Sequence, residues 1–251
     1  MADAAGSTGR LRALAVALAV GILGLVVAFV LGAAVVLPLS LAGIEVGATT
    51  LIVISLVTGQ GIAFGGVALG YLRYRGLGRG YIGAHVPSIL DGVTAVIGYG
   101  LALVAVFLGA ILITLTQVEP AENQVGTIAV ENPEVLLLLI PASFLLIGPG
   151  EELLFRGVVQ GRLREGFGPV VGVLLASVIF AAIHFTALTG GVGGRLATIG
   201  ILFFPSLVFG SAYELTDNIA VPAFIHGAYN ATLFTGLYVV LQSGGTPPGL
   251  L

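Results

Sequence analysis

Residues 140–156 read IPASFLLIGPGEELLFR and place two adjacent glutamates, Glu151 and Glu152, directly after an apolar run. A carboxylate at membrane depth is costly unless it is paired or hydrated, so such a residue is by default a functional candidate. Arg156 follows Glu152 by four residues, which puts both on one helical face and predicts an ion pair. Glu151 points about 100° away from that pair. The stretch therefore predicts a membrane helix with one paired and one free carboxylate.

The rest of the chain has the composition of a membrane protein. Of its 251 residues, 57% are apolar and 8% are charged, and the mean hydropathy is +1.13. Apolar runs near the spanning length of about 20 residues recur along it. The expected spans are Leu11–Leu37, Thr50–Leu72, Ile89–Thr116, Glu134–Ile147 running on past Glu151, Val170–Phe185, Leu196–Tyr213 and Ile219–Leu241. We predict an all-α polytopic membrane protein with seven transmembrane helices, or eight if the fourth span splits, and an intramembrane polar cavity.

The chain reads as one integral membrane domain over residues 10–251, preceded by a disordered tail at Met1–Gly9, with a catalytic core at about residues 136–241. Cysteine is absent, which excludes disulfides and thiol catalysis. No basic patch indicates a nucleic-acid partner. The expected partners are membrane lipid and a membrane-associated peptide.

Arginine placement predicts the orientation. Arginines precede the first span and follow the second and fourth, whereas the loop Gln117–Glu134 carries four glutamates and no arginine. The positive-inside rule then puts the N-terminus and the arginine loops in the cytoplasm and the acidic loop outside. The cell membrane is the expected location.

Local signals mark several helix ends. Ser88 and Asp91 have the spacing of a capping box, and Asn132 stands where it can cap the fourth span. The sequence Gly148-Pro149-Gly150 is a candidate break just before Glu151.

Polar residues interrupt the apolar pattern at three places in the C-terminal half. These are the pair of glutamates with Arg156, His184 with Phe180 one turn before it, and His226 with Asn230 one turn after it. Inward-facing Glu and His from several helices are how bundles build reactive or metal-binding centres. Each piece alone also has a structural interpretation, as an ion pair or a helix-packing hydrogen bond. Only three histidines occur in the chain; His85 lies in a polar loop and is expected at the surface.

The ordered set Glu151-Glu152-Leu-Leu-Phe-Arg156-Gly, Phe180-x-x-x-His184 and His226-x-x-x-Asn230 resembles the three motifs of the CPBP (CAAX protease and bacteriocin-processing, or Abi) family of intramembrane proteases. The resemblance covers about residues 136–241. It implies an all-helical fold with a catalytic cavity inside the membrane that opens toward the cytoplasm. It also implies that Glu151 activates water, that His184, His226 and Asn230 line the cavity, and that Glu152 and Arg156 support it. Members that resemble the prenyl-protein endopeptidase cut a prenylated CaaX tail.

These residue types suit peptide hydrolysis, which needs a base for water, donors for the oxyanion and an acid for the leaving amine. The cofactor stays open: Glu151, His184 and His226 are also candidate zinc ligands with an open water position. No His-Glu-x-x-His helix is present, and a metal-free glutamate mechanism explains the same set, so we favour no obligatory ion. The alternative function is that of a non-catalytic membrane scaffold, chaperone or immunity protein of the same fold. A transporter is a third, weaker alternative.

Two features disagree with this interpretation. Counting about 1.5 Å per residue from the expected span boundaries puts Glu151 nearer the inner side and His184 nearer the outer side. The sequence Glu214-Leu-Thr-Asp217-Asn218 departs from the turn that usually precedes the last motif of the family.

Overall fold

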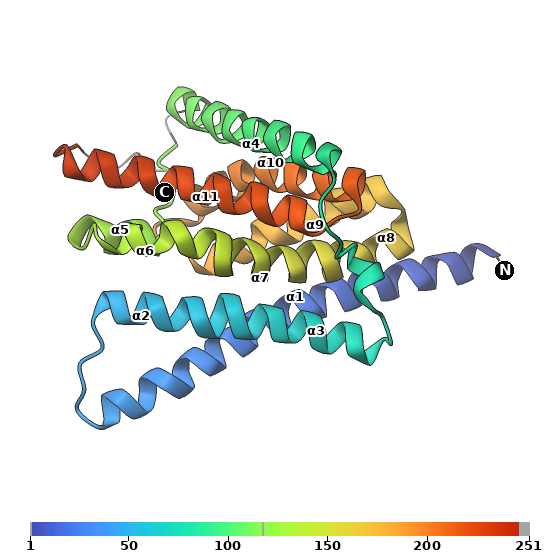
Figure 1. The fold of residues 1–251 in the computed structure, drawn as a ribbon, viewed down its shortest axis with the longest axis horizontal. Helices are drawn as coiled ribbons and strands as arrows, with labels where there is room; N and C mark the ends of the chain where they lie inside the picture. The colour runs from blue at the N-terminus through green and yellow to red at the C-terminus, as the bar shows by residue number, and fades with distance from the viewer. Residues whose placement is uncertain (1, 117, 246–251) are drawn as a thin grey trace.

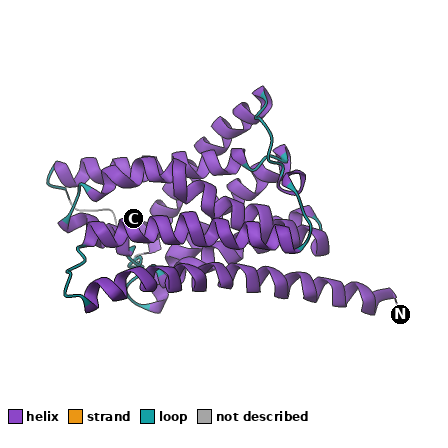
Figure 2. Cartoon of the chain, turned by 60° about the horizontal axis from the view of Figure 1, so that its bottom comes forward, coloured by secondary structure: helices purple, strands orange, loops and turns teal. Residues whose placement is uncertain are grey.

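The computed structural model describes residues 2–116 and 118–245, and over these ranges it is helical without a β-strand (Figure 2). Gln117, the first residue of the acidic loop, lies outside them. The α-helices are α1 (Ala2–Leu41), α2 (Ala48–Ser55), α3 (Gly65–Tyr74), α4 (Ile89–Thr116), α5 (Gln124–Glu131), α6 (Val135–Ala142), α7 (Gly148–Glu152), α8 (Gly161–Phe167), α9 (Pro169–Ile183), α10 (Val192–Thr216) and α11 (Ala220–Gln242). π-Helical stretches η1 (Leu56–Phe64), η3 (Ser143–Ile147) and η4 (Leu153–Gln160) join some of them. Short 3₁₀ turns, η2 (Arg79–Ile82) and η5 (His184–Thr186), complete the list.

The helices form one bundle in which α6 and α7 lie between the α2–α3 helix and α11 (Figure 1). Helix α4 covers α10 and α11 on the edge of the bundle away from α1. The turn after α1 and the acidic segment lie at one end of the bundle, and the connection after α3 lies at the other, with the N-terminus (Figure 1). We call these the acidic end and the arginine end.

Seven helical segments are long and apolar enough to cross a membrane, which confirms the predicted all-α polytopic fold for the described residues. They are Thr8–Leu41, Ala48–Tyr74, Ile89–Leu115, Val135–Phe167, Pro169–Thr186, Val192–Thr216 and Ala220–Gln242. The fourth does not split into two spans. Helix α1 runs back to Ala2, through most of the segment expected to be a tail; disorder of that segment stays a prediction.

Helix starts follow the sequence in one case and not in another. The capping box is confirmed, because the Ser88 amide donates to Asp91 Oδ2 at 2.7 Å and the Asp91 amide donates to Ser88 Oγ at 3.2 Å. The cap expected from Asn132 is wrong: Asn132 ends α5, and its side-chain amide donates to the Ile128 carbonyl at 3.5 Å. Helix α5 itself was not predicted. It begins at Asn123, whose side chain accepts from the Val125 amide at 2.9 Å.

The Gly148-Pro149-Gly150 sequence does not break the fourth span. The helix continues through it as α7 and changes to π-helical geometry on both sides. The glycines serve close packing: a Cβ on Gly148 would lie 2.5 Å from the Ala223 carbonyl oxygen, and one on Gly150 would lie 2.0 Å from the Gln60 carbonyl oxygen. Only glycine allows backbones to approach this closely. Helix α11 and stretch η1 are thereby held directly against the turn that carries Glu151.

The depth mismatch between Glu151 and His184 disappears because the fourth span is longer than expected. It continues to Phe167, and the chain reverses at Gly168, which has φ +81°. Glu151 lies sixteen residues before Phe167, and His184 lies fifteen residues after Pro169. Residues equally far from the turn of an antiparallel pair share a level. The fourth span was predicted to run on past Glu151 without a defined end; the structure places that end at Phe167, and the two motifs meet.

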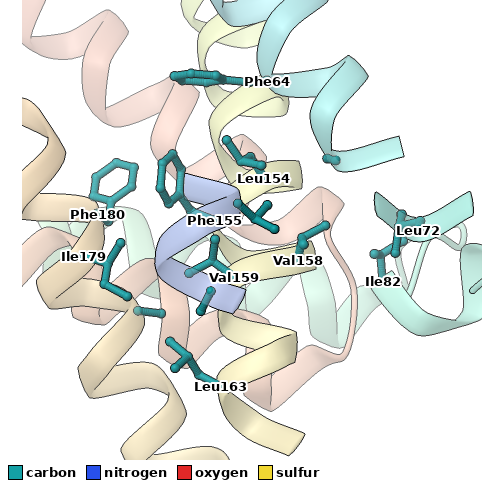
Figure 3. Packing of buried hydrophobic residues seen from close by; sticks show 14 of the residues in the cluster. Phe64, Leu72, Ile82, Leu154, Phe155, Val158, Val159, Leu163, Ile179 and Phe180 are labelled. Carbon is teal, nitrogen blue, oxygen red and sulfur yellow. The ribbon is translucent and has the colours of Figure 1, made fainter. Parts of the chain in front are cut away.

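A buried apolar cluster fixes the back of this helix pair. Phe155 lies edge-on between Phe64 of η1, at 6.0 Å between ring centroids, and Phe180 of α9, at 5.3 Å (Figure 3). Leu154, Val158 and the other members pack around it, all nearly inaccessible to solvent. Stretch η4 thus presents its apolar side chains to η1, α1 and α9, which sets the position of the polar residues that precede it.

The arginine end is held by polar contacts between loops. Glu165 accepts a hydrogen bond from the Tyr81 hydroxyl at 2.8 Å and pairs with Arg75 at 3.5 Å and with Arg162. Burial, then this hydrogen bond, raise the pKa of Tyr81. Arg164 pairs with Glu214 at 3.5 Å. The arginine-bearing loops therefore share one end of the bundle, as the sequence predicted.

The unusual turn before the last helix is well formed. Asp217 ends α10 with φ +45°, in the left-handed conformation that Asp tolerates. Asn218 is fully buried; its side-chain oxygen accepts from the Ala220 amide at 3.1 Å, and its amide donates to Asp91 at 3.3 Å. The side chain of His85, which is exposed as expected, lies 3.3 Å from the same amide. The sequence Glu214–Asn218 departs from the family pattern, but α11 still begins shortly after it, at Ala220.

Candidate functional site

A cavity of about 260 Å³ lies between α7, α9, α10 and α11 and is lined by residues from all three motifs. Its lining includes Glu151, Phe180, His184, His226 and Asn230. The remaining walls are mostly apolar, from α4, α10 and α11. An apolar pocket with a few converging polar groups is the usual form of a binding or catalytic site.

Glu152 is fully buried and contacts two partners at once. One carboxylate oxygen accepts from Arg156 Nε at 2.8 Å, and the other lies 2.8 Å from His226 Nδ1. Arg156, also fully buried, donates to Ser206 Oγ of α10 at 3.1 Å. The sequence predicted the pair with Arg156. It did not predict that the same carboxylate would orient a motif histidine on α11.

Glu151 reaches the same histidine from the other side. Its Oε2 lies 3.9 Å from His226 Nε2, too far for a direct hydrogen bond. This buried oxygen has no hydrogen-bond partner among the described residues. A buried acceptor without a partner is costly and rare. Glu151 is therefore the free carboxylate that the sequence indicated, and its free oxygen belongs to a residue that lines the cavity.

The His226 ring is fixed by both edge and face. Because the paired Glu152 carboxylate can only accept, His226 Nδ1 carries the proton in this contact. Phe209 stacks on the ring at 4.8 Å between centroids with an interplanar angle of 18°. A carboxylate that holds one nitrogen of an imidazole sets the tautomer and aims the other nitrogen, as in catalytic triads. Nε2 is thereby directed toward Glu151.

His184 follows the last turn of α9 and is half-buried. Its Nδ1 donates to the Phe180 carbonyl oxygen at 2.8 Å, which leaves Nε2 as an acceptor in the neutral ring. The Phe180 ring lies 4.9 Å from the His184 ring and 5.7 Å from the His226 ring, and Arg156 covers it at 4.8 Å. Phe180 therefore spaces the two imidazoles and contacts the cation of the buried ion pair.

Among the lining residues that the sequence analysis did not name, Phe209 and Gln60 matter most for the chemistry of the cavity. Phe209 lies on α10 in an apolar run with no distinguishing pattern. Gln60 is a polar residue inside the apolar second span, and that was a signal that it faces the bundle interior. Its side-chain Oε1 is buried without a partner among the described residues.

The cavity extends from Glu151 toward the acidic end of the bundle. There it is lined by Ala121, Asn123 and Val125 of the acidic segment and by Leu188 after α9. Backbone hydrogen bonds hold the two segments together, from Gln124 to Ala187 at 3.1 Å and from Thr189 to Glu122 at 2.8 Å. We expected the arginine loops in the cytoplasm and a cavity that opens toward the cytoplasm. These two expectations cannot both hold for a cavity that extends toward the acidic end, because the arginine loops lie at the opposite end. The orientation stays a prediction.

The candidate zinc ligands do not fit a metal site as they are arranged. Among the described residues, no three His, Cys, Asp or Glu side chains are grouped closely enough to hold an ion. His226 Nδ1 contacts Glu152 and His184 Nδ1 contacts a backbone carbonyl, which leaves Nε2 of both rings free, so it is the spacing of the side chains that disfavours an ion. The geometry does not support the metalloprotease-like interpretation, and we derive no step through a metal.

Comparison with known proteins agrees with this site. Residues 133–232 match the family model described as type II CAAX prenyl endopeptidase Rce1-like. A curated relative, the uncharacterized protein YpbD of Bacillus subtilis (strain 168), is 38% identical over 86 residues, which are 33% of this chain and 36% of that protein. The chain thus matches only about a third of the length of that relative. No solved structure matches.

The matched segment holds all three motifs and every cavity residue that they predicted. The match over residues 133–232 bears out the resemblance to the CAAX protease family that the motif order indicated. Helices α1 to α5, including Gln60, lie outside the match.

Proposed function

We propose that the protein is an intramembrane endopeptidase that uses water activated by Glu151 to cleave a membrane-associated or lipidated peptide. The observation that carries this proposal is the unpaired carboxylate oxygen of Glu151, a residue that lines one apolar cavity with His184, His226 and Asn230. A purely structural carboxylate would be paired as Glu152 is. The family match supports a CAAX-protease-like activity.

The residues divide the reaction as follows. Glu151 takes one proton from water while the water oxygen attacks the scissile carbonyl carbon, and His184 Nε2 accepts a hydrogen bond from the O–H that the attacking oxygen keeps. The oxyanion that forms is stabilised by the Asn230 amide and by His226, whose Nε2 donates when the ring is protonated. Glu151 then gives its proton to the leaving nitrogen as the C–N bond breaks. The products are a carboxylic acid and an amine.

Glu152 and Arg156 act on this reaction through His226. The Arg156 guanidinium offsets the charge of Glu152 in a place without water. Glu152 in turn keeps the Nδ1 proton of His226 in position. The resemblance implied that this pair supports the site. We propose that it does so by orienting His226, in addition to stabilising its own helix.

The test uses purified protein in liposomes with a farnesylated peptide that ends in a CaaX sequence and carries a fluorophore and a quencher on either side of the prenylated cysteine. We expect cleavage by the wild type and loss of at least about 100-fold in kcat for Glu151→Gln, the usual contribution of a general base. Thermal unfolding of the variant should match the wild type, because the lost charge has no direct partner. Comparing membrane-protein C-termini in cells that carry the wild type or Glu151→Ala then identifies natural substrates.

Equal cleavage by the wild type and Glu151→Gln would contradict the proposal. An intact fold that cleaves neither the peptide nor any cellular protein would favour the non-catalytic scaffold instead.

A further inference from the structure

Stretch η1 brings a polar side chain from outside the matched segment into the catalytic cavity. Gln60 lines the cavity together with Glu151 and is half-buried. Its carbonyl oxygen lies against Gly150, since a Cβ there would be 2.0 Å from that oxygen. Residue 60 is thus a direct backbone neighbour of the residue that precedes Glu151.

The Gln60 amide has no evident structural task. Its Oε1 is buried without a hydrogen-bond partner among the described residues. Two other polar groups of the cavity wall are engaged: Thr198 Oγ1 with the Ala121 backbone at 3.1 Å and 3.3 Å, and the Asn123 side chain with the Val125 amide at 2.9 Å. A buried acceptor that bonds nothing is destabilising, so an unpaired amide oxygen on a residue that lines the same cavity as Glu151 indicates a ligand.

The backbone geometry around Gln60 is itself unusual. The residue lies in a nine-residue π-helical stretch, Leu56–Phe64, within the second span. π-Helical turns are rare and occur frequently at functional sites. Gly59 and Ala63 of this stretch are buried. The stretch can therefore hold the Gln60 side chain in a fixed place.

We propose that Gln60 anchors the backbone of the substrate peptide next to the scissile bond. A primary amide presents an acceptor and a donor side by side. One residue of an extended peptide turns its N–H and C=O to the same side of the chain, so the two groups match. A peptide drawn into a mostly apolar cavity must have these groups satisfied. Gln60 supplies that partner beside Glu151 and aligns the scissile carbonyl with the activated water.

This inference rests on the proposed protease activity and deepens it by assigning substrate alignment to the half of the chain that the family match leaves out. It also assigns the ligand class: an extended peptide backbone, bound independently of side-chain identity.

The experiment uses the farnesylated fluorogenic peptide and a series in which one backbone N–H at a time, on either side of the scissile bond, is replaced by an ester oxygen. In the wild type, one position should lower kcat/KM by roughly 10-fold, the effect of leaving one buried acceptor unpaired. The variant Gln60→Met keeps the side-chain length and removes the amide. It should lower kcat/KM for the parent peptide by roughly 10- to 100-fold. The ester at the sensitive position should then cause no further decrease in kcat/KM of this variant.

Thr58→Val is the matched control. Thr58 lies on the same stretch, and its hydroxyl donates to its own helix, at the Ile54 carbonyl, at 2.7 Å. This variant should keep both the wild-type rate and the ester sensitivity. A merely structural role for Gln60 would leave the ester penalty unchanged in Gln60→Met, and that result would overturn the inference. The inference would also be overturned if kcat/KM of the wild type did not change with any ester peptide. That measurement does not depend on the folding of a variant.

The outcomes separate the two proposals. If Glu151→Gln is inactive and Gln60→Met behaves as the wild type does, only the role of Gln60 fails. If Glu151→Gln cleaves normally, the protease mechanism itself fails.

Discussion

The arginine end and the cavity are built from the same helices, yet the carboxylates they carry, Glu165 and Glu151, differ in their partners. At the arginine end, Glu165 contacts Tyr81, Arg75 and Arg162. In the cavity, Glu151 Oε2 and Gln60 Oε1 have no partner among the described residues. The first group is partly exposed, where water can replace a lost partner, whereas the second is shielded from water.

An unpaired buried atom alone does not mark a ligand site, because Arg162 Nε at the arginine end is also buried without a partner among the described residues; Glu151 and Gln60 differ in that they line the cavity. An unpaired polar atom costs little in contact with water and about 1–3 kcal/mol when it is buried. Selection for stability alone would pair or remove the buried ones. Glu152 lies between the two cases, because it is buried, fully paired and attached to a cavity histidine.

The largest effect on stability is expected from Glu152→Ala. The change leaves Arg156 buried without its carboxylate, which costs about 3–5 kcal/mol, and it frees the His226 ring to change tautomer. The control Glu165→Ala removes a carboxylate that is 30% exposed, and should cost no more than about 1 kcal/mol. Thermal or denaturant unfolding in detergent measures both, and peptide cleavage should fall only for Glu152→Ala.

Similar losses of stability for the two variants would remove the distinction between the two ends. Full cleavage by a folded Glu152→Ala would show that His226 does not depend on this carboxylate.

Local contacts were predictable from the sequence, and contacts that depend on tertiary packing were less so. The ion pair of Glu152 with Arg156 and the capping box of Ser88 with Asp91 follow from spacings of four and three residues. The contact of Glu152 with His226 joins residues 74 positions apart. Motif order predicted that these residues share a site, but not which nitrogen meets which carboxylate.

The depth error has a definite cause. The fourth span was predicted to run on past Glu151, but its end was not placed relative to Glu151 and Arg156. In the structure both are buried within the helix, which continues to Phe167. Burial of a charge pair cannot be read from hydropathy, because it depends on the partners that Ser206 and His226 provide from other helices.

A second expected difference concerns two glycines of the fourth span. A Cβ on Gly150, beside the cavity, would lie 2.0 Å from a backbone oxygen of η1, which cannot move without its helix. We expect Gly150→Ala to cost about 1–3 kcal/mol by overpacking and to lower cleavage, because it shifts the turn that carries Glu151. A Cβ on Gly161, at the arginine end, would meet the hydroxyl of Tyr81 at 2.9 Å, the far end of a side chain that can turn away.

Gly161→Ala should therefore cost clearly less, and cleavage should stay at the wild-type rate. Unfolding and cleavage assays on the two variants measure the difference. The opposite order would show that the contact between η1 and α7 is more adaptable than its close packing indicates.

The smallest effect is expected from removal of metal ions. A zinc-dependent site loses its activated water when the ion is stripped. Here, in the part of the chain that the structure describes, no three His, Cys, Asp or Glu side chains are grouped closely enough to hold an ion. We therefore expect purified protein to keep most of its activity on the farnesylated peptide after exhaustive treatment with a strong chelator. Elemental analysis should find well under one zinc per chain. Stoichiometric zinc, with activity lost on chelation and restored by zinc alone, would instead mean that the cavity rearranges to let Glu151, His184 and His226 converge on an ion, and it would replace the glutamate mechanism.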